Sequence, residues 1–470
     1  MNYIIYKIEN ESPIDEYIFN FIFSIIGVIG KKFDDSGNYL DIYYGNNFNE
    51  NDCKIMIRKN NNDIIWNDLL EGNINIKNFN KVIPFDIINA IGLFLTDRVN
   101  SKLSDESFDL FDRLRFDMSF QHKKKISHIP IVNIYTLFFK EILNDKLSID
   151  FFPLWPFGKK CAIALSHDVD TPDKYSIIKN FPINIFNLLK RGEIIRTMHH
   201  LKHFVIYGYK YIKDKNKNNF WLFNEIMQEE SRLGMKSCFY FASMNQFGEY
   251  GCDIDVSYSI KNKKFGDIFK TIRSNGFEIG LHASYFALDS LTRFKKEKLI
   301  LSEAVGLEII GLRHHYWHIG KDEELTLANQ SRAGFKYDSS IAFNEEMGFR
   351  RNVAFPYYPW NSAERFPINI LQLPVFLMDG NLFYREIEVQ DAVNKVADMI
   401  QVIKNYNGLG VIDWHVRTSY PSNKEYYKWG QAYLKIIEYL SSCKEIWVTS
   451  PGEIYNWLKD REKKLNIERK

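Results

Sequence analysis

The sequence has little cysteine, almost no net charge and no hydrophobic run long enough to cross a bilayer. Its 470 residues include 5 cysteines, an odd number without a C-x-x-C pair, which is typical of a reduced chain and not of a disulfide-stabilised secreted one. The most apolar stretch, 17–30, is too short to span a membrane, and the N-terminus lacks the basic and apolar pattern of a secretory signal. We therefore expect a cytoplasmic protein without a transmembrane segment.

The charge balance and the missing loop motifs exclude further classes. Lys and Arg number 61 and Asp and Glu 59, a net charge of +2, so nothing favours nucleic acid as a partner. A Walker-type phosphate loop and a G-x-G-x-x-G fingerprint are both absent, so nucleotide binding has no support. By contrast, 45% of the residues are hydrophobic and 16% are aromatic, enough for a large core and for rings that line a sugar-binding groove.

Residues 1–150 are predicted to form a small α/β domain. The expected strands are 3–8 and 40–44, and the expected helices are 15–28, 84–95 and 132–143. This part has no reactive residues at a diagnostic spacing, and its function stays open.

From residue 151 to 470, short apolar runs alternate with longer amphipathic ones. Repeated strand and helix in this order indicates parallel strands with crossover helices. Seven or eight such repeats predict a (β/α) barrel, possibly incomplete, in which reactive residues follow the carboxyl ends of the strands.

Asp168 and Asp170 come at the end of the first predicted barrel strand, after Cys161–Leu165. Residues two apart in a strand share a face, so these carboxylates lie close together, as a metal ligand and a general base would. A helix N-cap is the alternative for Asp170, but capping does not explain both residues.

Two further strand ends carry histidines. His282 ends a short buried strand, where a hydrogen-bonded core histidine is the alternative to a metal ligand. Arg313 and His315 share a face at the next strand end. There Arg313 could orient a carboxylate and His315 could bind metal or transfer a proton, unless this is an exposed polar loop.

A fourth strand end has Asp413 and His415 on one face and Trp414 on the other. A carboxylate beside a histidine fixes the ring tautomer and favours the imidazolium, which suits a general acid for an amine leaving group. A buried Asp–His hydrogen bond of structural purpose is the alternative.

With these motifs, residues 155–460 resemble the polysaccharide deacetylase family, also called NodB-homology or carbohydrate esterase family four. The resemblance lies in Ser166-His167-Asp168-Val169-Asp170, in Gly280-Leu281-His282-Ala283-Ser284, in Arg313 and in His415. It implies that Asp168 is the catalytic base, that Asp170 and His282 bind a divalent metal, for which we expect zinc, that Arg313 positions the base and that His415 is the general acid.

The chain departs from the family pattern at Phe286, where the second motif has another histidine. We expect His315 to supply the third ligand beside Asp170 and His282. The run from Arg313 to Tyr316 and the segment Gly348-Phe349-Arg350 also resemble a bacterial subgroup in which a small uncharacterised domain precedes the barrel, and which tends to have the single-histidine motif.

The resemblance implies a metal-dependent hydrolase that removes N-acetyl groups from a sugar of a surface glycan or its precursor. Tyr316, Arg350 and Trp414 are candidate substrate contacts, and the two aromatic rings could either stack on sugars or pack in the core. A metal-free glycan-binding protein on the same barrel, or a hydrolase of another C–N bond, remain alternatives. The basic segment 185–218 would allow peripheral contact with an anionic inner membrane face and a lipid-linked sugar, or it is a solvated helical surface. The oligomeric state is open.

Overall fold

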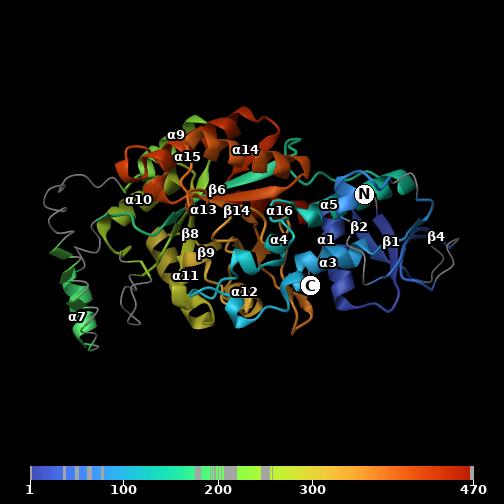
Figure 1. Ribbon diagram of the computed structural model, residues 1–470, viewed down its shortest axis with the longest axis horizontal. Helices are drawn as coiled ribbons and strands as arrows, with labels where there is room; N and C mark the ends of the chain where they lie inside the picture. Colours follow the sequence, from blue (N-terminus) through green and yellow to red (C-terminus); the bar gives the residue numbers. More distant parts are fainter. Residues whose placement is uncertain are drawn as a thin grey trace.

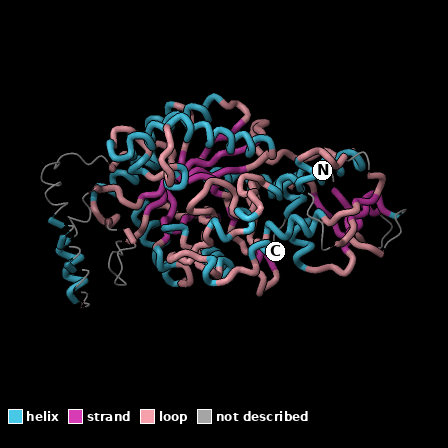
Figure 2. Tube along the Cα trace, viewed as in Figure 1, coloured by secondary structure: helices cyan, strands magenta, loops and turns pink. Residues whose placement is uncertain are grey.

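The computed structural model shows an elongated molecule with a small sheet at one end and a large curled sheet in the middle (Figures 1 and 2). It describes residues 3–34, 39–47, 52–60, 66–75, 79–174, 181–190, 192, 194, 197–198, 201–202, 204–205, 220–244, 255–256 and 258–465. Within these ranges no helix combines the length and the apolar character that a bilayer-spanning segment needs. Most of 185–218, including His199, His200 and His203, lies outside the described residues.

The first sheet has five parallel strands in the order β2-β1-β3-β4-β5. The strands are β1 (Tyr3–Ile8), β2 (Ile29–Lys32), β3 (Leu40–Tyr44), β4 (Cys53–Ile57) and β5 (Val82–Ile83). The helices of this unit include α1 (Pro13–Ile26), α2 (Trp66–Leu70), α3 (Ile87–Leu95), α4 (Phe120–Lys123) and α5 (Ile131–Leu147). The predicted small α/β unit is therefore present.

Helix α1 is bounded by clear local signals. The side chain of Ser12 accepts a hydrogen bond from the Asp15 backbone, and Pro13 occupies the first turn, where its missing N–H costs nothing. Gly27 ends the helix at φ +82°, and a Cβ there would lie 2.0 Å from the Phe152 carbonyl oxygen. The end of α1 thus packs directly against the segment that enters the barrel.

The large sheet has nine strands, and all of its pairings are parallel. The strands are β6 (Cys161–Val169), β7 (Ser237–Phe241), β8 (Glu278–Ala283), β9 (Gly311–His314), β10 (Tyr337–Asp338), β13 (Leu371–Gln372), β14 (Val375–Met378), β15 (Leu409–Asp413) and β16 (Ile446–Thr449). The long helices are α9 (Phe223–Arg232), α10 (Lys263–Ser274), α11 (Leu291–Val305), α12 (Glu323–Arg332), α14 (Val389–Asn405), α15 (Tyr427–Ser442) and α16 (Pro451–Lys464). They surround the curled sheet (Figure 1).

Two pairings make this sheet an irregular barrel. β13 pairs with β10 and β14 pairs with β15, although only Leu373 and Pro374 separate β13 from β14 along the chain. One continuous segment thus connects the two ends of the curled sheet. Along one edge of β6, the first residues of this strand pair with β16 and the last residues pair with β7. The predicted (β/α) barrel, incomplete relative to eight regular strands, is confirmed.

The interior of the barrel is filled by alternate residues of each strand. In β6, Ala162 and Ala164 belong to the interior cluster, whereas Ile163 and Leu165 pack outward against the helices. Glycine occurs inside where large rings cross the barrel. A Cβ on Gly280 would lie 2.4 Å from the Tyr240 ring, and a Cβ on Gly311 would lie 1.9 Å from the ring of Tyr337. The barrel interior is therefore filled by side chains, so a binding site is expected at the ends of the strands and not inside the barrel.

The N-terminal unit shares its core with the barrel. Its apolar cluster includes Val353, Phe355, Tyr357 and Trp360, which precede β13. The predicted boundary at residue 150 stays a prediction, and the two parts pack as one body along this contact.

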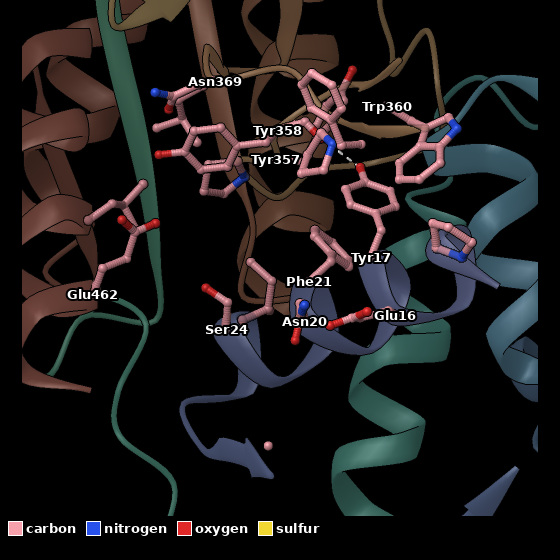
Figure 3. Close-up of a pocket in the computed structure, with 18 of the residues that line it drawn as sticks. Glu16, Tyr17, Asn20, Phe21, Ser24, Tyr357, Tyr358, Trp360, Asn369 and Glu462 are labelled. Carbon is pink, nitrogen blue, oxygen red and sulfur yellow. Dashed lines mark hydrogen bonds between the residues drawn. The ribbon is translucent and has the colours of Figure 1, made fainter. Parts of the chain in front are cut away.

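A cavity of about 790 Å³ opens beside the same contact. In Figure 3, Tyr17 and Phe21 of α1 face Tyr358 and Trp360 across it, and the Tyr17 hydroxyl donates to the Tyr358 carbonyl at 2.7 Å. The cavity adjoins the start of β13 and does not include the residues at the carboxyl ends of the strands.

Arg461 of α16 connects the two parts by hydrogen bonds. Its guanidinium, 1% exposed, donates to the carbonyls of Ser24, Ile25, Phe152 and Pro153. Burial lowers the pKa of Arg461 to about 10, so the side chain stays charged at neutral pH.

Replacing Arg461 by Leu is expected to destabilise the protein by about 3 kcal/mol, because four backbone carbonyls lose a charged donor. Thermal and urea unfolding measure the loss. Lys463→Leu on the same helix, an exposed residue, is the matched control and should change stability by less than about 0.5 kcal/mol. Equal effects of the two substitutions would contradict this role of Arg461.

Candidate metal centre and active site

The ends of β6, β8 and β9 bring charged side chains together at one mouth of the barrel. The inward alternation of β6 continues through Ser166 and Asp168 to Asp170, directly after the strand. β8 contributes His282, β9 contributes Arg313, and His315 follows β9. These are the residues that sequence alternation placed on the interior face.

Asp170 is the centre of this group. Its Oδ1 lies 3.1 Å from His282 Nε2 and 3.8 Å from His315 Nε2. Its Oδ2 lies 3.0 Å from His415 Nε2 and accepts a hydrogen bond of 3.0 Å from Arg417. One oxygen therefore faces the two histidines of the predicted ligand set, and the other is held by two cationic groups.

Asp170, His282 and His315 have ligand atoms within 4.8 Å of one another. Two ligand atoms on a tetrahedral zinc lie about 3.3 Å apart, given bonds of ~2.0 Å. Both rings are held from behind, since His282 Nδ1 lies 3.1 Å from the Arg313 carbonyl and His315 Nδ1 lies 3.0 Å from Asp255 Oδ1. Such contacts fix the tautomer that turns Nε2 to a metal. The donor set fits a divalent cation, and its oxygen and imidazole ligands suit zinc.

The charges of this group shift its pKa values strongly. Burial alone would raise the pKa of Asp170, but His415, His282 and Arg417 hold it well below its usual range. Burial alone would lower the pKa of His282, but Asp168 and Asp170 raise it. The carboxylate is thus kept ionised, which a metal ligand requires.

Arg313 holds Asp168 from inside the barrel. Its Nη1 donates to Asp168 Oδ1 at 3.0 Å, and its Nη2 donates to Ser166 Oγ at 2.9 Å and to Ser339 Oγ at 3.1 Å. The guanidinium is fully buried. Asp168 is 4% exposed, and its Oδ2 lies 3.8 Å from His282 Nε2. A fixed carboxylate beside a candidate metal ligand is the arrangement that a general base needs.

His415 is supported by Asp379, not by Asp413 as the sequence predicted. Asp379 Oδ1 lies 2.8 Å from His415 Nδ1, and Asp379 Oδ2 accepts from the His415 backbone and from Thr418. Asp413 instead lies 3.0 Å from Arg313 Nη1. The prediction failed because β15 ends at Asp413, so strand alternation does not extend to His415.

The two carboxyl groups differ in their charge state. Burial raises the pKa of Asp413 to about 8, although Arg313 opposes the shift. Burial alone would raise the pKa of Asp379, but His415, Thr418 and Arg417 together lower it. Asp379 and Asp170 together hold the pKa of His415 well above its ordinary value against the effect of burial. His415 is therefore held in its charged form at neutral pH.

Two of the three predicted substrate contacts are wrong. Trp414 has no exposed surface and packs against Phe383 and Tyr433. Arg350 is 6% exposed and forms ion pairs with Asp97 and Glu323, so it connects the N-terminal unit to α12.

Tyr316, the third predicted contact, is 39% exposed. Its ring centroid lies 4.5 Å from that of His315. Its role as a substrate contact stays a prediction.

Sequence reasoning missed Asp379 and Asp255. Asp379 directly follows the strand β14, so the same strand-end criterion could have found it. Asp255 lies in a loop, yet it is buried, accepts a hydrogen bond from the Tyr285 backbone and contacts His315. Nothing in its local sequence indicated that position.

No family model matches the chain, and no curated protein matches it. The solved structures it is similar to include a Mycobacterium smegmatis protein classed with the polysaccharide deacetylases, at 16% identity and a TM-score of 0.43 over 66% of this chain and 93% of that one. A peptidoglycan deacetylase of Bacillus subtilis has 13% identity and a TM-score of 0.31 over 65% and 96% of the two chains. The polysaccharide deacetylase Bc1974 of Bacillus cereus has 14% identity and a TM-score of 0.29 over 62% and 91%.

Replacing His315 by Ala is expected to reduce bound zinc severely, because the cluster loses one of three protein ligands. Metal analysis after dialysis against a weak chelator measures the loss. His128→Ala, at an exposed position outside the cluster, is the control and should retain the wild-type zinc content. Unchanged zinc in the His315 variant would exclude it as a ligand.

Proposed function

We propose that this chain is a metal-dependent hydrolase that removes an N-acetyl group from a sugar of a surface glycan or its precursor. The observation that carries the proposal is the meeting of three parts at one barrel mouth: the cluster of Asp170, His282 and His315, the Asp168–Arg313 pair, and the His415–Asp379 pair. Amide hydrolysis needs an electrophile, a base and an acid in this proximity.

A divalent cation held by Asp170, His282 and His315 would polarise the acetyl carbonyl and favour ionisation of the attacking water. Asp168 would accept the proton of that water as its oxygen bonds to the carbonyl carbon. Arg313, with donors also on Ser166 and Ser339, keeps Asp168 in one orientation during this step.

Breakdown of the tetrahedral species requires a proton on the departing nitrogen. His415 would supply it as the C–N bond breaks, leaving acetate and the free amine of the sugar. Asp379 holds the Nδ1 of His415, so that Nε2 is the nitrogen that faces the cluster. Asp379 and Asp170 raise the pKa of His415, so that its ring carries the proton that it would donate.

The first test is metal analysis of the purified chain together with acetate release from N-acetylated oligosaccharides and from simple amides. The proposal predicts zinc or another divalent metal in the protein, and acetate release from the sugars that stops on chelation. Bound metal with activity on simple amides alone would favour another C–N hydrolase. A metal-free protein that binds glycans without releasing acetate would favour a binding role.

The roles of the two carboxyl groups near His415 can be separated. His415→Ala should lower kcat by about 10²–10⁴, the usual contribution of a general acid. Asp379→Asn should lower kcat on the order of 10², because the imidazolium loses its counter-charge. Asp413→Asn should cost clearly less, since Asp413 with its pKa of about 8 is largely protonated at pH 7.

Metal content should remain unchanged in the His415 and Asp379 variants, which distinguishes proton transfer from metal loss. Wild-type kcat in His415→Ala would remove this residue from the mechanism. A larger loss in Asp413→Asn than in Asp379→Asn would reverse the assignment of the supporting carboxylate.

We also propose a cytoplasmic location with peripheral contact to an anionic membrane face, which would bring the site to a lipid-linked sugar. Support comes from the described residues between 186 and 205, where large apolar side chains are exposed near the exposed Lys190 and Lys202. These apolar residues are Phe186, Leu189, Ile194, Met198, Leu201 and Val205. Helix α7 (Phe181–Lys190) projects from the body at the end opposite the N-terminal sheet (Figure 1).

Co-sedimentation with phosphatidylglycerol vesicles tests this contact. The intact chain should bind anionic vesicles more strongly than neutral ones, and Phe186→Glu with Leu189→Glu should weaken binding at least tenfold. Leu299→Glu, at an exposed leucine of α11, is the control. Absence of binding by the intact chain would dismiss the membrane proposal without affecting the hydrolase.

A further inference from the structure

A hairpin of the N-terminal unit reaches the turn that carries His315. Residues Phe108 and Leu114 form an antiparallel bridge, and the side-chain Oδ1 of Asp109 accepts hydrogen bonds from the backbone N–H groups of Phe111 and Arg113. The side chain of Arg113 is fixed by Asp109, at 2.8 Å from Nε to Oδ2. We call Phe108–Leu114 the hairpin. It is a compact unit whose tip residues are held by their own backbone contacts.

The hairpin contacts Tyr316, the residue directly after His315. Arg113 Nη1 donates to the Tyr316 carbonyl at 3.0 Å and to Asn344 Oδ1 at 2.9 Å. The rings of Phe111 and Tyr316 are stacked, with centroids 4.9 Å apart and planes at 10°. The hairpin thus contacts Tyr316 of the barrel twice, by a hydrogen bond from Arg113 and by ring stacking with Phe111.

The turn that the hairpin holds is conformationally costly. Tyr316 has φ +60° and Trp317 has φ +51°, a region that bulky L-residues rarely adopt. Two successive residues in this region persist only when their surroundings determine the conformation. Trp317 is buried, but Tyr316 is partly exposed, and the hairpin supplies a hydrogen bond to its carbonyl and a ring stacked on its own. Relaxation of this turn would move the adjacent His315.

We infer that Arg113 and Phe111 are positioning residues for the metal site, and that the N-terminal unit completes the site by holding His315 through Tyr316. The inference rests on the metal cluster of the proposed function and goes beyond it, because it gives residues 1–150 a part in that cluster. His315 is held on two sides, by Asp255 at Nδ1 and by the hairpin through the backbone. Asp170 and His282, which belong to regular strand geometry, need no such help.

The experiment is a zinc titration of the metal-free full-length chain against a chromophoric chelator, with the visible spectrum of the cobalt(II) form as a second readout. Arg113→Ala and Phe111→Ala should each weaken zinc binding about tenfold, the effect usual for groups that orient a ligand. The cobalt spectrum should change as the His315 nitrogen is lost. Phe111→Tyr retains the stacked ring and should retain wild-type affinity.

Arg115→Ala is the matched control, since Arg115 is the next arginine along and pairs with Asp117 on the surface. In a His315→Ala background, Arg113→Ala should cause no further loss, because the two residues act through the same ligand. A thermal unfolding curve of each variant shows whether it is folded.

The outcomes separate the two claims. Wild-type protein that binds no metal would overturn the proposed function and this inference together. Metal binding by wild type that is unchanged in folded Arg113→Ala and Phe111→Ala would overturn the inference alone. Losses that add in the His315→Ala background would also overturn it, since Arg113 would then act on the cluster by another route.

Discussion

The carboxylate of Asp170 is the point on which the polar part of this structure depends. Its two oxygens have different partners: one faces His282 and His315, and the other lies against His415 and Arg417. A buried carboxylate is tolerated only when it is paired, and here every partner is itself buried or nearly so. The charged groups at the barrel mouth therefore stabilise one another, and a single one of them would be unfavourable there without its partners. A cation on the first oxygen would leave the contacts of the second intact.

The predictability of this site follows from how regular the backbone is at each residue. Asp168, Asp170, His282 and Arg313 lie on or directly after strands, so a period of two places them correctly inside the barrel. Asp413 and His415 do not share that geometry, since the strand ends between them, and the true partner Asp379 comes from another strand end. No periodicity places Arg350 or Trp414 on the interior face, and both side chains are buried. Asp255 comes from a loop, where no periodicity relates sequence to position.

The regularity of the backbone also explains why the fold could be predicted from the sequence. Apolar runs of strand length alternate with amphipathic helices throughout the second part, and parallel strands with outer helices are the simple way to bury both. What the sequence did not indicate is the closure by one segment that pairs with β10 at its start and with β15 at its end. Nor did the sequence indicate that the apolar core of the N-terminal unit extends to Val353–Trp360, because contacts between distant segments leave no local pattern.

The substitution at Phe286 bears on whether the site is complete. A zinc site whose two histidines follow the same strand needs a second histidine close to His282, and this chain has Phe286 in that place. His315 comes from the neighbouring strand end, with its Nε2 3.8 Å from Asp170 Oδ1, but its turn has backbone angles that are costly for tyrosine and tryptophan. A ligand supplied by a regular strand needs no outside support, whereas a ligand on a strained turn does. If His315 is the third ligand, the contacts of Arg113 and Phe111 with Tyr316 are what the relocation of that ligand requires. The N-terminal unit and the unusual motif would then be two parts of one adaptation.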